Sequence, residues 1–321
     1  MSKKTIEVIV PCYNEEPCIR PFYDEIKKVF EQDLSNYEYK LFFIDDGSKD
    51  NTLEEIKKLV DIAGDEVIKY ASFSRNFGKE SALYIGFAQS SGDYVVPMDA
   101  DLQHPPFLLK EMALAMEEGY DCAAARRVSR KGEAKVRSFF SSAYYHIINA
   151  LTSVKMVPGS TDFRMMNRTV VEAILSFTEV DRFTKGIYSW VGYKTKWIDY
   201  ENVERKHGTT KWSFRGLIRY ASTGYFGFAT RPLRVILYLG MFITLAVVIY
   251  AIFFAINTLM DTQRLRTGYT TILMVVTFFG GLIITLLGMI GEYLARIYME
   301  VKHRPIYLVR ETNVKDESEA V

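Results

Sequence analysis

Two long stretches without a charged residue lie near the C-terminal end of this chain. The first runs from Val235 to Met260 and the second from Thr267 to Gly291, separated by the short connection 261–266. At a rise of about 1.5 Å per residue, a helix over either stretch would be about 37 Å long or more, enough to cross a hydrocarbon layer of about 30 Å. A soluble domain of this size rarely holds two helices that are apolar on every side. The pattern therefore predicts two transmembrane helices, at about 235–260 and 267–291.

Basic residues around these stretches predict their orientation. Two arginines precede the first stretch and two lie in the connection, whereas the second stretch is followed by Arg296, Lys302, Arg304 and Arg310. The apolar part of the N-terminal ten residues is too short for a secretory signal. Since an even number of spans leaves both termini on one side, we expect a multi-pass protein of the plasma membrane, with its large N-terminal domain and both termini in the cytoplasm.

The first 130 residues alternate short apolar runs with amphipathic stretches. The runs predict strands at Ile6–Val10, Tyr39–Ile44, Val67–Ser72, Tyr94–Met98 and Cys122–Ala125. Helical spacing is present in two sets, Phe22, Ile26, Val29 and Phe30, and Leu53, Ile56, Leu59 and Val60. A capping box, Thr52 with Glu55, is predicted to open the second helix. The order strand, helix, strand predicts an α/β fold with a mostly parallel sheet covered on both faces.

Polar clusters follow each predicted strand. They are Asn14-Glu15, Asp45-Asp46-Gly47-Ser48, Ser74-Arg-Asn-Phe-Gly78, Asp99-Ala-Asp101 and Arg126-Arg127. In open parallel sheets, ligands bind outside the carboxyl ends of the strands. We therefore expect these five clusters to converge on one site.

Asp99 and Asp101 are the best candidates for metal ligands. Residues two apart in an extended segment face the same side, so both carboxylates can reach one hard cation and connect it to phosphate oxygens. A solvated turn or a helix start is the alternative for an isolated pair of this kind. The four neighbouring clusters favour the metal site.

Charge and cysteine content exclude several classes. The 321 residues include 40 basic and 39 acidic ones, a net charge of +1, which argues against nucleic-acid binding through broad phosphate neutralisation. The three cysteines, Cys12, Cys18 and Cys122, have neither an even count nor the spacing of a metal finger. Neither a disulfide framework nor a thiolate metal site is expected.

Four ordered motifs carry a family resemblance. They are Val10-Pro-Cys-Tyr-Asn-Glu-Glu16, Ile44-Asp-Asp-Gly-Ser-Lys-Asp-Asn-Thr52, Ser74-Arg-Asn-Phe-Gly-Lys-Glu80 and Met98-Asp-Ala-Asp-Leu-Gln-His-Pro-Pro106. Together they resemble family 2 glycosyltransferases of the GT-A fold. With the two predicted spans, the chain resembles the branch that glucosylates bacterial polyprenyl phosphate (bactoprenol), which is related to dolichyl-phosphate mannose synthases.

The resemblance implies a donor site for a sugar nucleotide. The implied nucleotide-binding residues are Pro11, Tyr13, Asn14, Glu15, Asp45, Asp46, Lys79 and Asp99. Carboxylates suit this role because they accept hydrogen bonds from ribose hydroxyls or a base N–H; capping of the next helix is the alternative for Asp45 or Asp46. Asp99, Asp101 and Gln103 are expected to hold Mg²⁺ or Mn²⁺ across the diphosphate, whereas His104, followed by two prolines, is expected to be a turn residue.

Basic residues are expected to bind phosphate. They are Arg126, Arg127, Arg205 and Lys211, the last two within Arg205-Lys-His-Gly-Thr-Thr-Lys211. This segment resembles the Arg-x-x-Gly-x-(Ser/Thr)-Lys pattern that the family places near the phosphates. A solvated surface loop is the alternative.

Asp162 has two possible roles. Gly159-Ser-Thr-Asp-Phe-Arg164 resembles the acceptor-side segment of the family, in which this aspartate is the proposed catalytic base. A lipid monophosphate has its second pKa near 6 and is already largely a dianion at neutral pH, so it needs no base. Asp162 could instead orient the acceptor or Arg164, or cap a helix.

Residues 1–210 are expected to form the catalytic domain and 211–232 an amphipathic juxtamembrane segment. Residues 233–298 would hold the two spans and 299–321 a cytoplasmic tail. Apolar stripes at helical spacing within 136–151 and 214–221 are candidate membrane-surface helices, although core packing explains the first about equally well.

The predicted activity is inverting, metal-dependent transfer of a hexose from a nucleoside diphosphate sugar to undecaprenyl phosphate. UDP-glucose is favoured by resemblance; N-acetylglucosamine, galactose and mannose remain alternatives, and the resemblance suggests a homotetramer. A processive polysaccharide synthase is disfavoured, because the chain lacks a Gln-x-x-Arg-Trp motif. A non-catalytic membrane scaffold or sugar-nucleotide sensor is the alternative of another class.

Overall fold

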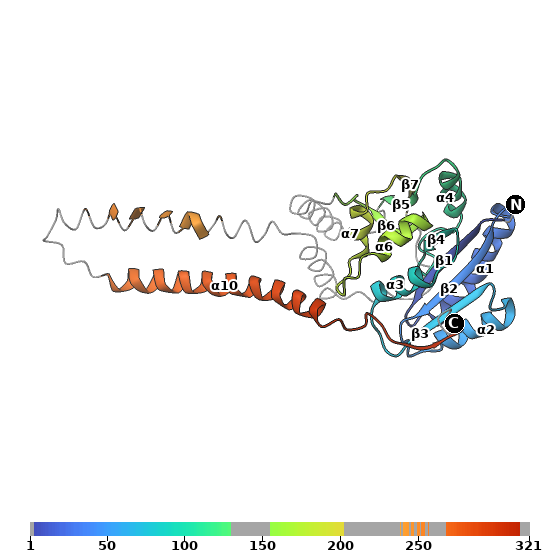
Figure 1. The fold of residues 1–321 in the computed structure, drawn as a ribbon, viewed down its shortest axis with the longest axis horizontal. Coiled ribbons are helices and arrows are strands. Elements are labelled where there is room, and N and C mark those ends of the chain that lie inside the picture. The colour runs from blue at the N-terminus through green and yellow to red at the C-terminus, as the bar shows by residue number, and fades with distance from the viewer. Residues whose placement is uncertain are drawn as a thin grey trace. The chain divides into compact units, whose positions relative to one another are not determined.

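One mixed sheet organises the N-terminal domain. The computed structural model describes residues 3–129, 155–201 and 268–314, with single residues between 238 and 256. Within these residues, eight strands form a sheet in the order β7-β5-β6-β4-β1-β2-β3-β8 (Figure 1). The strands are β1 Thr5–Cys12, β2 Glu38–Asp45, β3 Ile68–Phe73, β4 Tyr94–Pro97, β5 Cys122–Ser129, β6 Ser160–Asn167, β7 Thr195–Glu201 and β8 Val309–Thr312.

Most neighbouring strands are parallel, as the sequence predicts. β3, β2, β1 and β4 form a parallel block, and β5 is parallel to β7. β6 is antiparallel to both β4 and β5, and β8 is antiparallel to β3. The five predicted strands correspond to β1–β5. Strands β6, β7 and β8 are not predicted, because polar residues interrupt their apolar patterns.

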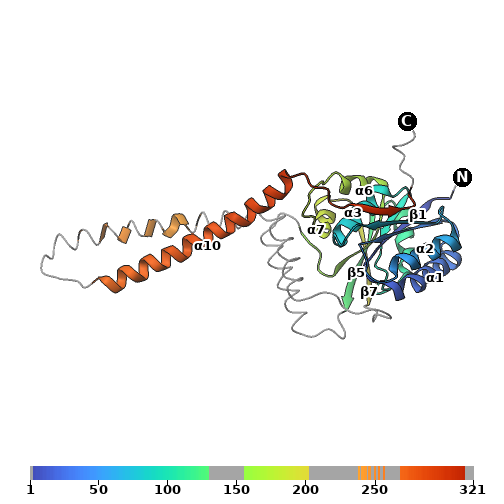
Figure 2. The same ribbon diagram turned by 90° about the horizontal axis from the view of Figure 1, so that it is seen from below.

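Helices cover both faces of the sheet. They are α1 Glu16–Asp33, α2 Thr52–Ala63, α3 Lys79–Gln89, α4 Leu108–Glu117, α6 Arg168–Leu175, α7 Thr184–Trp190 and the long α10 Tyr269–Val301. Figure 2 shows α1 and α2 on one side of the sheet and α3 and α6 on the other. The polar strand ends are therefore framed by helices on two sides.

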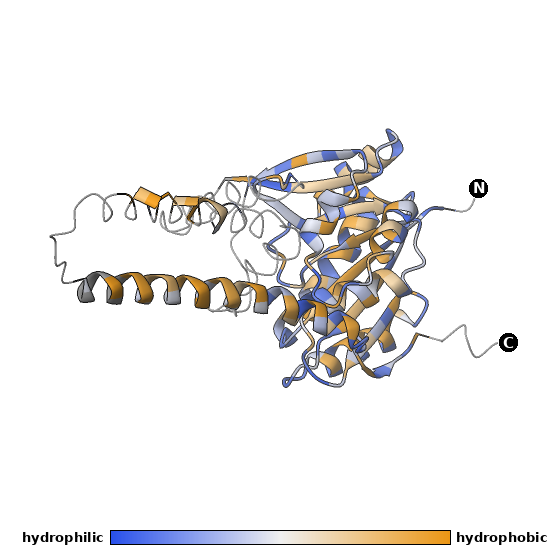
Figure 3. Ribbon diagram, turned by 60° about the vertical axis from the view of Figure 1, so that its left-hand side comes forward, coloured by the Kyte–Doolittle hydropathy of each residue, from blue (hydrophilic) through white to orange (hydrophobic). Residues whose placement is uncertain are grey.

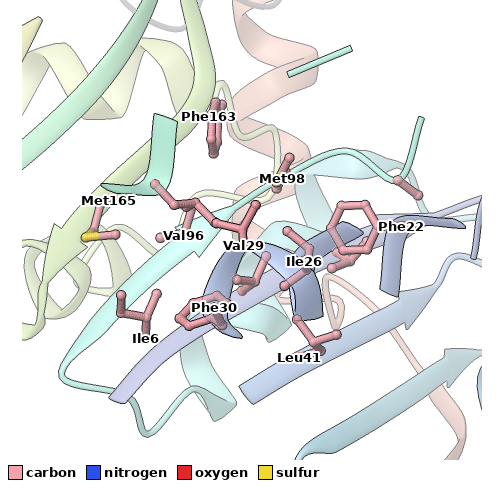
Figure 4. Close-up of a cluster of buried hydrophobic side chains, with 14 of the residues drawn as sticks. Ile6, Phe22, Ile26, Val29, Phe30, Leu41, Val96, Met98, Phe163 and Met165 are labelled. Carbon is pink, nitrogen blue, oxygen red and sulfur yellow. The ribbon is translucent and has the colours of Figure 1, made fainter. Parts of the chain in front are cut away.

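The core on the α1 face follows the predicted helical spacing. Phe22, Ile26 and Phe30 are all buried and lie against Ile6 and Leu41 of the sheet (Figure 4). Full burial of an apolar side chain of this size contributes roughly 1.5–3 kcal/mol. These contacts pack α1 against β1 and β2, the two strands that end at the first two polar clusters.

The opening of α2 differs from the prediction. The helix begins at Thr52, but the residue before it, Asn51, makes no side-chain cap. The Thr52 hydroxyl donates to Asp50 (2.5 Å) and accepts from the amide of Glu15 (2.8 Å). The predicted capping box of Thr52 and Glu55 is wrong, because the threonine instead joins the helix start to the turn after β1.

Helix α10 is long and apolar. Its stretch Val275–Val301 could cross a membrane by length and composition, and none of its most apolar window is buried. Figure 3 shows hydrophobic residues along most of this helix. The predicted span 267–291 lies largely on α10, which continues past Gly291 to Val301, and Glu292 and Arg296 pair one turn apart (3.1 Å) in this extension.

The other predicted span, 235–260, lies largely outside the described residues. The described ones among them are helical, including Tyr238, Phe242, Leu245, Tyr250 and Phe253. These five side chains are exposed. The candidate surface helices within 136–151 and 214–221 also lie outside the described residues.

The chain after α10 returns to the sheet. From Pro305 onward it belongs to the same compact unit as the strands, whereas α10 belongs to a second unit. β8 pairs with the outer side of β3 and closes that edge. The expected tail 299–321 therefore includes a strand of the N-terminal domain.

Candidate active site

The Lys79 ammonium joins two acidic side chains. Its Nζ lies 2.6 Å from Oδ1 of Asp99 and 3.0 Å from Oδ2 of Asp162. Lys79 is the first residue of α3, Asp99 follows the end of β4, and Asp162 lies in β6. Three separate elements thus place one cation between two carboxylates.

The strand register explains why these aspartates meet. Antiparallel β4 and β6 pair Val95 with Met166, and continuing this register past the end of β4 places Asp99 opposite Asp162. The sequence motif around Asp162 has no local link to Asp99. Only the insertion of β6 beside β4 creates the pair.

The three charges stabilise one another. Burial alone would raise the pKa of Asp162, but Lys79 and Lys185 hold that pKa well below its usual value. Burial likewise opposes ionisation of Asp99, and Lys79 lowers its pKa overall. The two carboxylates outweigh the effect of burial on Lys79 and raise its pKa. All three groups are therefore charged at neutral pH, and Asp162 is a weak proton acceptor.

The segment after Asp99 forms a tight turn. Oδ1 of Asp101 accepts a hydrogen bond from the backbone amide of Gln103 (3.1 Å), and Leu102 has a positive φ of 56°. Among the residues that the structure describes, no group of three or more His, Cys, Asp or Glu side chains could hold a metal ion. The sequence offers Asp99 and Asp101 as candidate ligands, and Mg²⁺ is commonly held by one or two carboxylates together with substrate phosphates.

His104 has a larger role than the predicted turn residue. It is buried, its ring stacks on Phe163 with centroids 5.4 Å apart, and its Nδ1 lies 2.9 Å from the hydroxyl of Tyr200. Its Nε2 lies 3.8 Å from Oδ2 of Asp99. Burial lowers the pKa of His104 to about 4, so the imidazole is neutral and supports the turn through packing. Its aromatic partners come from β6 and β7, which no local pattern reveals.

At the end of β2, Asp45 holds its own turn together. Its Oδ1 accepts from the amide of Ser48 (3.0 Å) and its Oδ2 accepts from the hydroxyl of Ser72 (2.7 Å). Gly47 completes the turn with a φ of 66°, and a Cβ there would lie 2.5 Å from the backbone carbon of Arg75. Glycine is required at this close approach.

Asp46 receives two backbone amides from the turn before α3. Its Oδ1 accepts from Phe77 (2.6 Å), and its Oδ2 accepts from Gly78 (2.9 Å). Burial raises the pKa of Asp46 to about 6, although both hydrogen bonds act in the opposite direction. Asp46 therefore titrates close to neutral pH.

The first two strand-end turns are joined by hydrogen bonds. Asn14, with a positive φ of 51°, donates its amide to the hydroxyl of Ser48 (2.9 Å) and accepts from the amide of Lys49 (2.8 Å). The backbone amide of Glu15 donates to the hydroxyl of Thr52. Pro11 lies in β1, and Tyr13 is half-buried in the same turn. The structure thus brings together the predicted residues of these two clusters.

The predicted arginine cluster lies inside a strand rather than after it. Arg126 and Arg127 belong to β5, which continues to Ser129. Arg126 pairs in register with Asp199 of β7 and binds its carboxylate through two nitrogens at 2.6 and 2.8 Å. The predicted end of this strand is wrong, because an edge partner extends it. Arg205 and Lys211 lie outside the described residues.

Near Asp162 lies a buried polar group, of which the sequence motif indicated only Arg164. The guanidinium of Arg164 lies over the ring of Tyr188, 3.8 Å from its centroid. Glu80 accepts from the amide of Thr184 (3.0 Å) and from its hydroxyl. Arg164 follows Asp162 by two positions on the same strand face, which was the one available signal.

Comparison with known proteins agrees with this architecture. Residues 7–175 match the model of glycosyl transferase family 2, and residues 231–297 match the model of the GtrB C-terminal hairpin. The CsbB protein of Bacillus subtilis (strain 168) is 46% identical over 98% of this chain and 94% of its own length. A bactoprenol glucosyl transferase of Shigella phage SfV is 37% identical over 97% of this chain and 99% of its own length.

Among solved structures, a mannosyltransferase from Pyrobaculum calidifontis in complex with GDP-Man and Mn²⁺ is 22% identical, with a TM-score of 0.44. It covers 65% of this chain and 59% of its own. The family assignment rests on the sequence matches. They confirm the resemblance carried by the four motifs, and the mixed sheet is of the GT-A type that this resemblance implies. The chain belongs to glycosyl transferase family 2 and is an enzyme of the glycosyltransferase class.

Proposed function

We propose that this enzyme transfers glucose from UDP-glucose to undecaprenyl phosphate or another polyprenyl phosphate. The observation that carries the proposal is the 37% identity, over nearly the full length of both chains, to a bactoprenol glucosyl transferase. The product would be a lipid-phosphate-linked sugar for modification of cell-envelope glycans.

On the donor side, Asp45, Asp46 and the turn of Asn14 and Glu15 would receive the nucleoside. Asp46 would accept a hydrogen bond from it through the lone pairs that remain beside the amides of Phe77 and Gly78. Asp99 and Asp101, with Gln103, would hold Mg²⁺ or Mn²⁺ against the diphosphate. A divalent cation there would neutralise the charge that develops on the departing nucleoside diphosphate.

The transfer itself needs no proton acceptor. A phosphate oxygen of the lipid attacks the anomeric carbon as the bond to the nucleoside diphosphate breaks, which inverts the configuration at that carbon. The acceptor is largely a dianion at neutral pH. The low pKa of Asp162 also makes it a poor base. We assign Asp162 a positioning role, in which it holds Lys79 beside Asp99.

The lipid acceptor accounts for the apolar C-terminal region. A polyprenyl chain remains in the bilayer, so the enzyme must work at the membrane surface, and α10 would serve as one anchor. The proposal also includes two membrane spans with both termini in the cytoplasm. It further includes a homo-oligomer and recruitment of the lipid phosphate by Arg205 and Lys211.

A reconstitution assay tests this function. The full chain in nanodiscs is incubated with radiolabelled UDP-glucose and undecaprenyl phosphate, with and without EDTA, and the label extracted with lipid is counted. We expect metal-dependent labelling that is lost in Asp101→Asn but kept in Asp61→Asn, which changes an exposed aspartate of α2. Parallel incubations with UDP-N-acetylglucosamine, UDP-galactose and GDP-mannose define the sugar. No lipid-extractable label from UDP-glucose would reject the proposal.

A further inference from the structure

The segment that follows α10 lies against the donor side of the catalytic domain. We call residues 306–312 the C-terminal strap. Its last part, β8, pairs antiparallel with β3, so that Ser72 lies opposite Glu311 and Ala71 opposite Thr312. Glu311 also pairs with Lys57 (2.7 Å) and accepts from the hydroxyl of Tyr70 (2.9 Å). The strap is thus a bound part of this domain.

The strap holds both ends of the turn between β3 and α3. The carbonyl of Leu308 accepts from the amide of Ser74 (2.9 Å), where the turn begins. The hydroxyl of Ser81, in the first turn of α3, lies 3.3 Å from the carbonyl oxygen of Ile306 and 3.2 Å from that of Phe77, and its one hydrogen is available to either. Two strap carbonyls therefore bracket residues 74–81.

Tyr307 supplies the apolar part of this contact. Its ring stacks on Phe73, with centroids 5.3 Å apart and an interplanar angle of 13°, and lies 6.4 Å from the ring of Tyr84. Phe73 in turn meets Phe77 edge to face at 5.7 Å. Aromatic pairs in these geometries stabilise one another beyond simple burial. Tyr307 thus supports Phe77 through Phe73.

The bracketed turn holds a donor-side carboxylate. Phe77 and Gly78 are the two residues whose amides bind Asp46. A second connection ends at the neighbouring carboxylate, since Arg310 lies 3.4 Å from the hydroxyl of Ser72, which donates to Asp45. The strap therefore reaches both carboxylates of the second strand end through one intermediate layer.

We propose that the C-terminal strap is a positioning element of the donor site, with Tyr307 as its principal positioning residue. It holds the turn 74–78 in the conformation that aims its amides at Asp46. This inference rests on the proposed function insofar as Asp46 contacts the donor. The C-terminal strap, which follows the predicted membrane hairpin in the sequence, would then be needed to complete a nucleotide site formed mainly by N-terminal residues.

The test compares three variants of the full chain in nanodiscs. Tyr307→Ala removes the ring, and Tyr307→Phe keeps it. Leu308→Ala shortens a neighbouring side chain, in a residue that is 54% exposed, and keeps the backbone carbonyl that accepts from Ser74. We expect Tyr307→Ala to raise the Kd for UDP-glucose about tenfold, with the KM for undecaprenyl phosphate unchanged. Tyr307→Phe and Leu308→Ala should stay close to the unsubstituted protein.

Hydrogen exchange separates this proposal from the proposed function. In Tyr307→Ala without donor, the amides of Phe77 and Gly78 should exchange faster, while those of α1 should not change. A wild-type Kd or unchanged exchange at these two amides would overturn the role of the strap. Failure of the unsubstituted protein to bind UDP-glucose would reject the proposed donor instead, and the exchange comparison would still test the strap.

A measurement without substitution covers the case in which Tyr307→Ala does not fold. Coupling between two sites is reciprocal, so a strap that favours donor binding must itself be stabilised by the donor. Saturating UDP-glucose should slow exchange of the Ser74 amide, which donates to Leu308. Unchanged exchange of this amide on donor binding would contradict the proposal.

Discussion

The Lys79 side chain joins two acidic residues for which the sequence predicts different roles. Its ammonium neutralises Asp99, a candidate metal ligand, and also Asp162, which lies in β6. The motif that contains Lys79 suggested nucleotide binding, and its contact with Asp162 was not foreseen. A sequence pattern can identify a charged residue as functional, but the identity of its partners depends on distant strands.

Replacement of Lys79 by methionine should destabilise the domain. Asp99 and Asp162 would then face each other without a shared cation, which lowers the free energy of unfolding. The loss is about 3–5 kcal/mol when a fully buried pair is broken, and we expect about 1–3 kcal/mol here because the Lys79 and Asp99 side chains are each 35% exposed. Thermal unfolding of the solubilised full chain measures the loss. Lys58→Met, which removes a surface ion pair with Glu55, is the matched control and should have little effect. A Lys79→Met variant as stable as this control would show that the bridge contributes nothing in solution.

Asp46 predicts a pH dependence of donor binding. With a pKa of about 6, it becomes a full hydrogen-bond acceptor only as the pH rises through 6, so the affinity for UDP-glucose should increase between about pH 5 and 7. The diphosphate of UDP-glucose does not titrate in this range. Calorimetric titration at several pH values measures the trend, and Asp46→Asn should abolish it. A flat profile for the unsubstituted protein would exclude Asp46 as the titrating donor contact.

The same pKa affects stability in the opposite direction. An aspartate titrates near 3.9 in the unfolded chain, so between about pH 4 and 6 the folded state binds the proton more tightly. The contribution of Asp46 to stability is therefore present below about pH 4 and is lost as the pH rises through 6. Binding and stability should respond oppositely to pH at this residue.

At the scale of elements, helix α3 carries the Lys79 end of the site against the sheet. Its approach depends on Gly86, where a Cβ would lie 2.3 Å from Cγ2 of Ile9. The period-two and period-3.6 patterns predicted strands β1–β5 and helices α1 and α2, because each is buried along a regular face. They failed for β6, β7 and β8, since these strands carry polar and charged residues that are stabilised by neighbours far away in the chain.

Gly86→Ala should therefore destabilise the protein, although alanine is the better helix former. The gain in helix propensity is about 1 kcal/mol, whereas overpacking of a buried contact costs typically 1–3 kcal/mol, and here the overlap is severe. We expect a lower melting temperature and a weaker interaction with the donor. Ala88→Gly, at an exposed position of the same helix, is the control and should cost about 1 kcal/mol. A Gly86→Ala variant more stable than the unsubstituted protein would show that α3 can move away from β1.

For the whole molecule, the predicted topology is that of a hairpin whose two ends lie on the same side of the membrane. The match of residues 231–297 to the GtrB C-terminal hairpin and the apolar length of α10 support membrane association. The return of the chain to β3 after α10 adds a structural reason for an even number of spans, because β1 and β8 belong to one sheet.

Cysteine labelling in intact cells tests this orientation. Thr262→Cys, in the predicted external connection, should react with a membrane-impermeant maleimide, whereas Ser2→Cys should react only after the cells are permeabilised. The native cysteines Cys12, Cys18 and Cys122 are buried, so background labelling should be low. Labelling of Ser2→Cys in intact cells would contradict the predicted topology.

Local sequence patterns are enough to predict the alternation of strands and helices, the apolar C-terminal stretches and the acidic clusters at the strand ends. These features follow from local hydrophobicity and periodicity, which each segment carries independently of its neighbours. The tertiary structure was needed to show that Lys79 joins Asp99 to Asp162, that His104 is a buried support, and that the C-terminal strap contacts the turn whose amides bind Asp46. Those contacts join residues far apart in the chain, and they depend on which strands become neighbours, a choice that no single segment encodes.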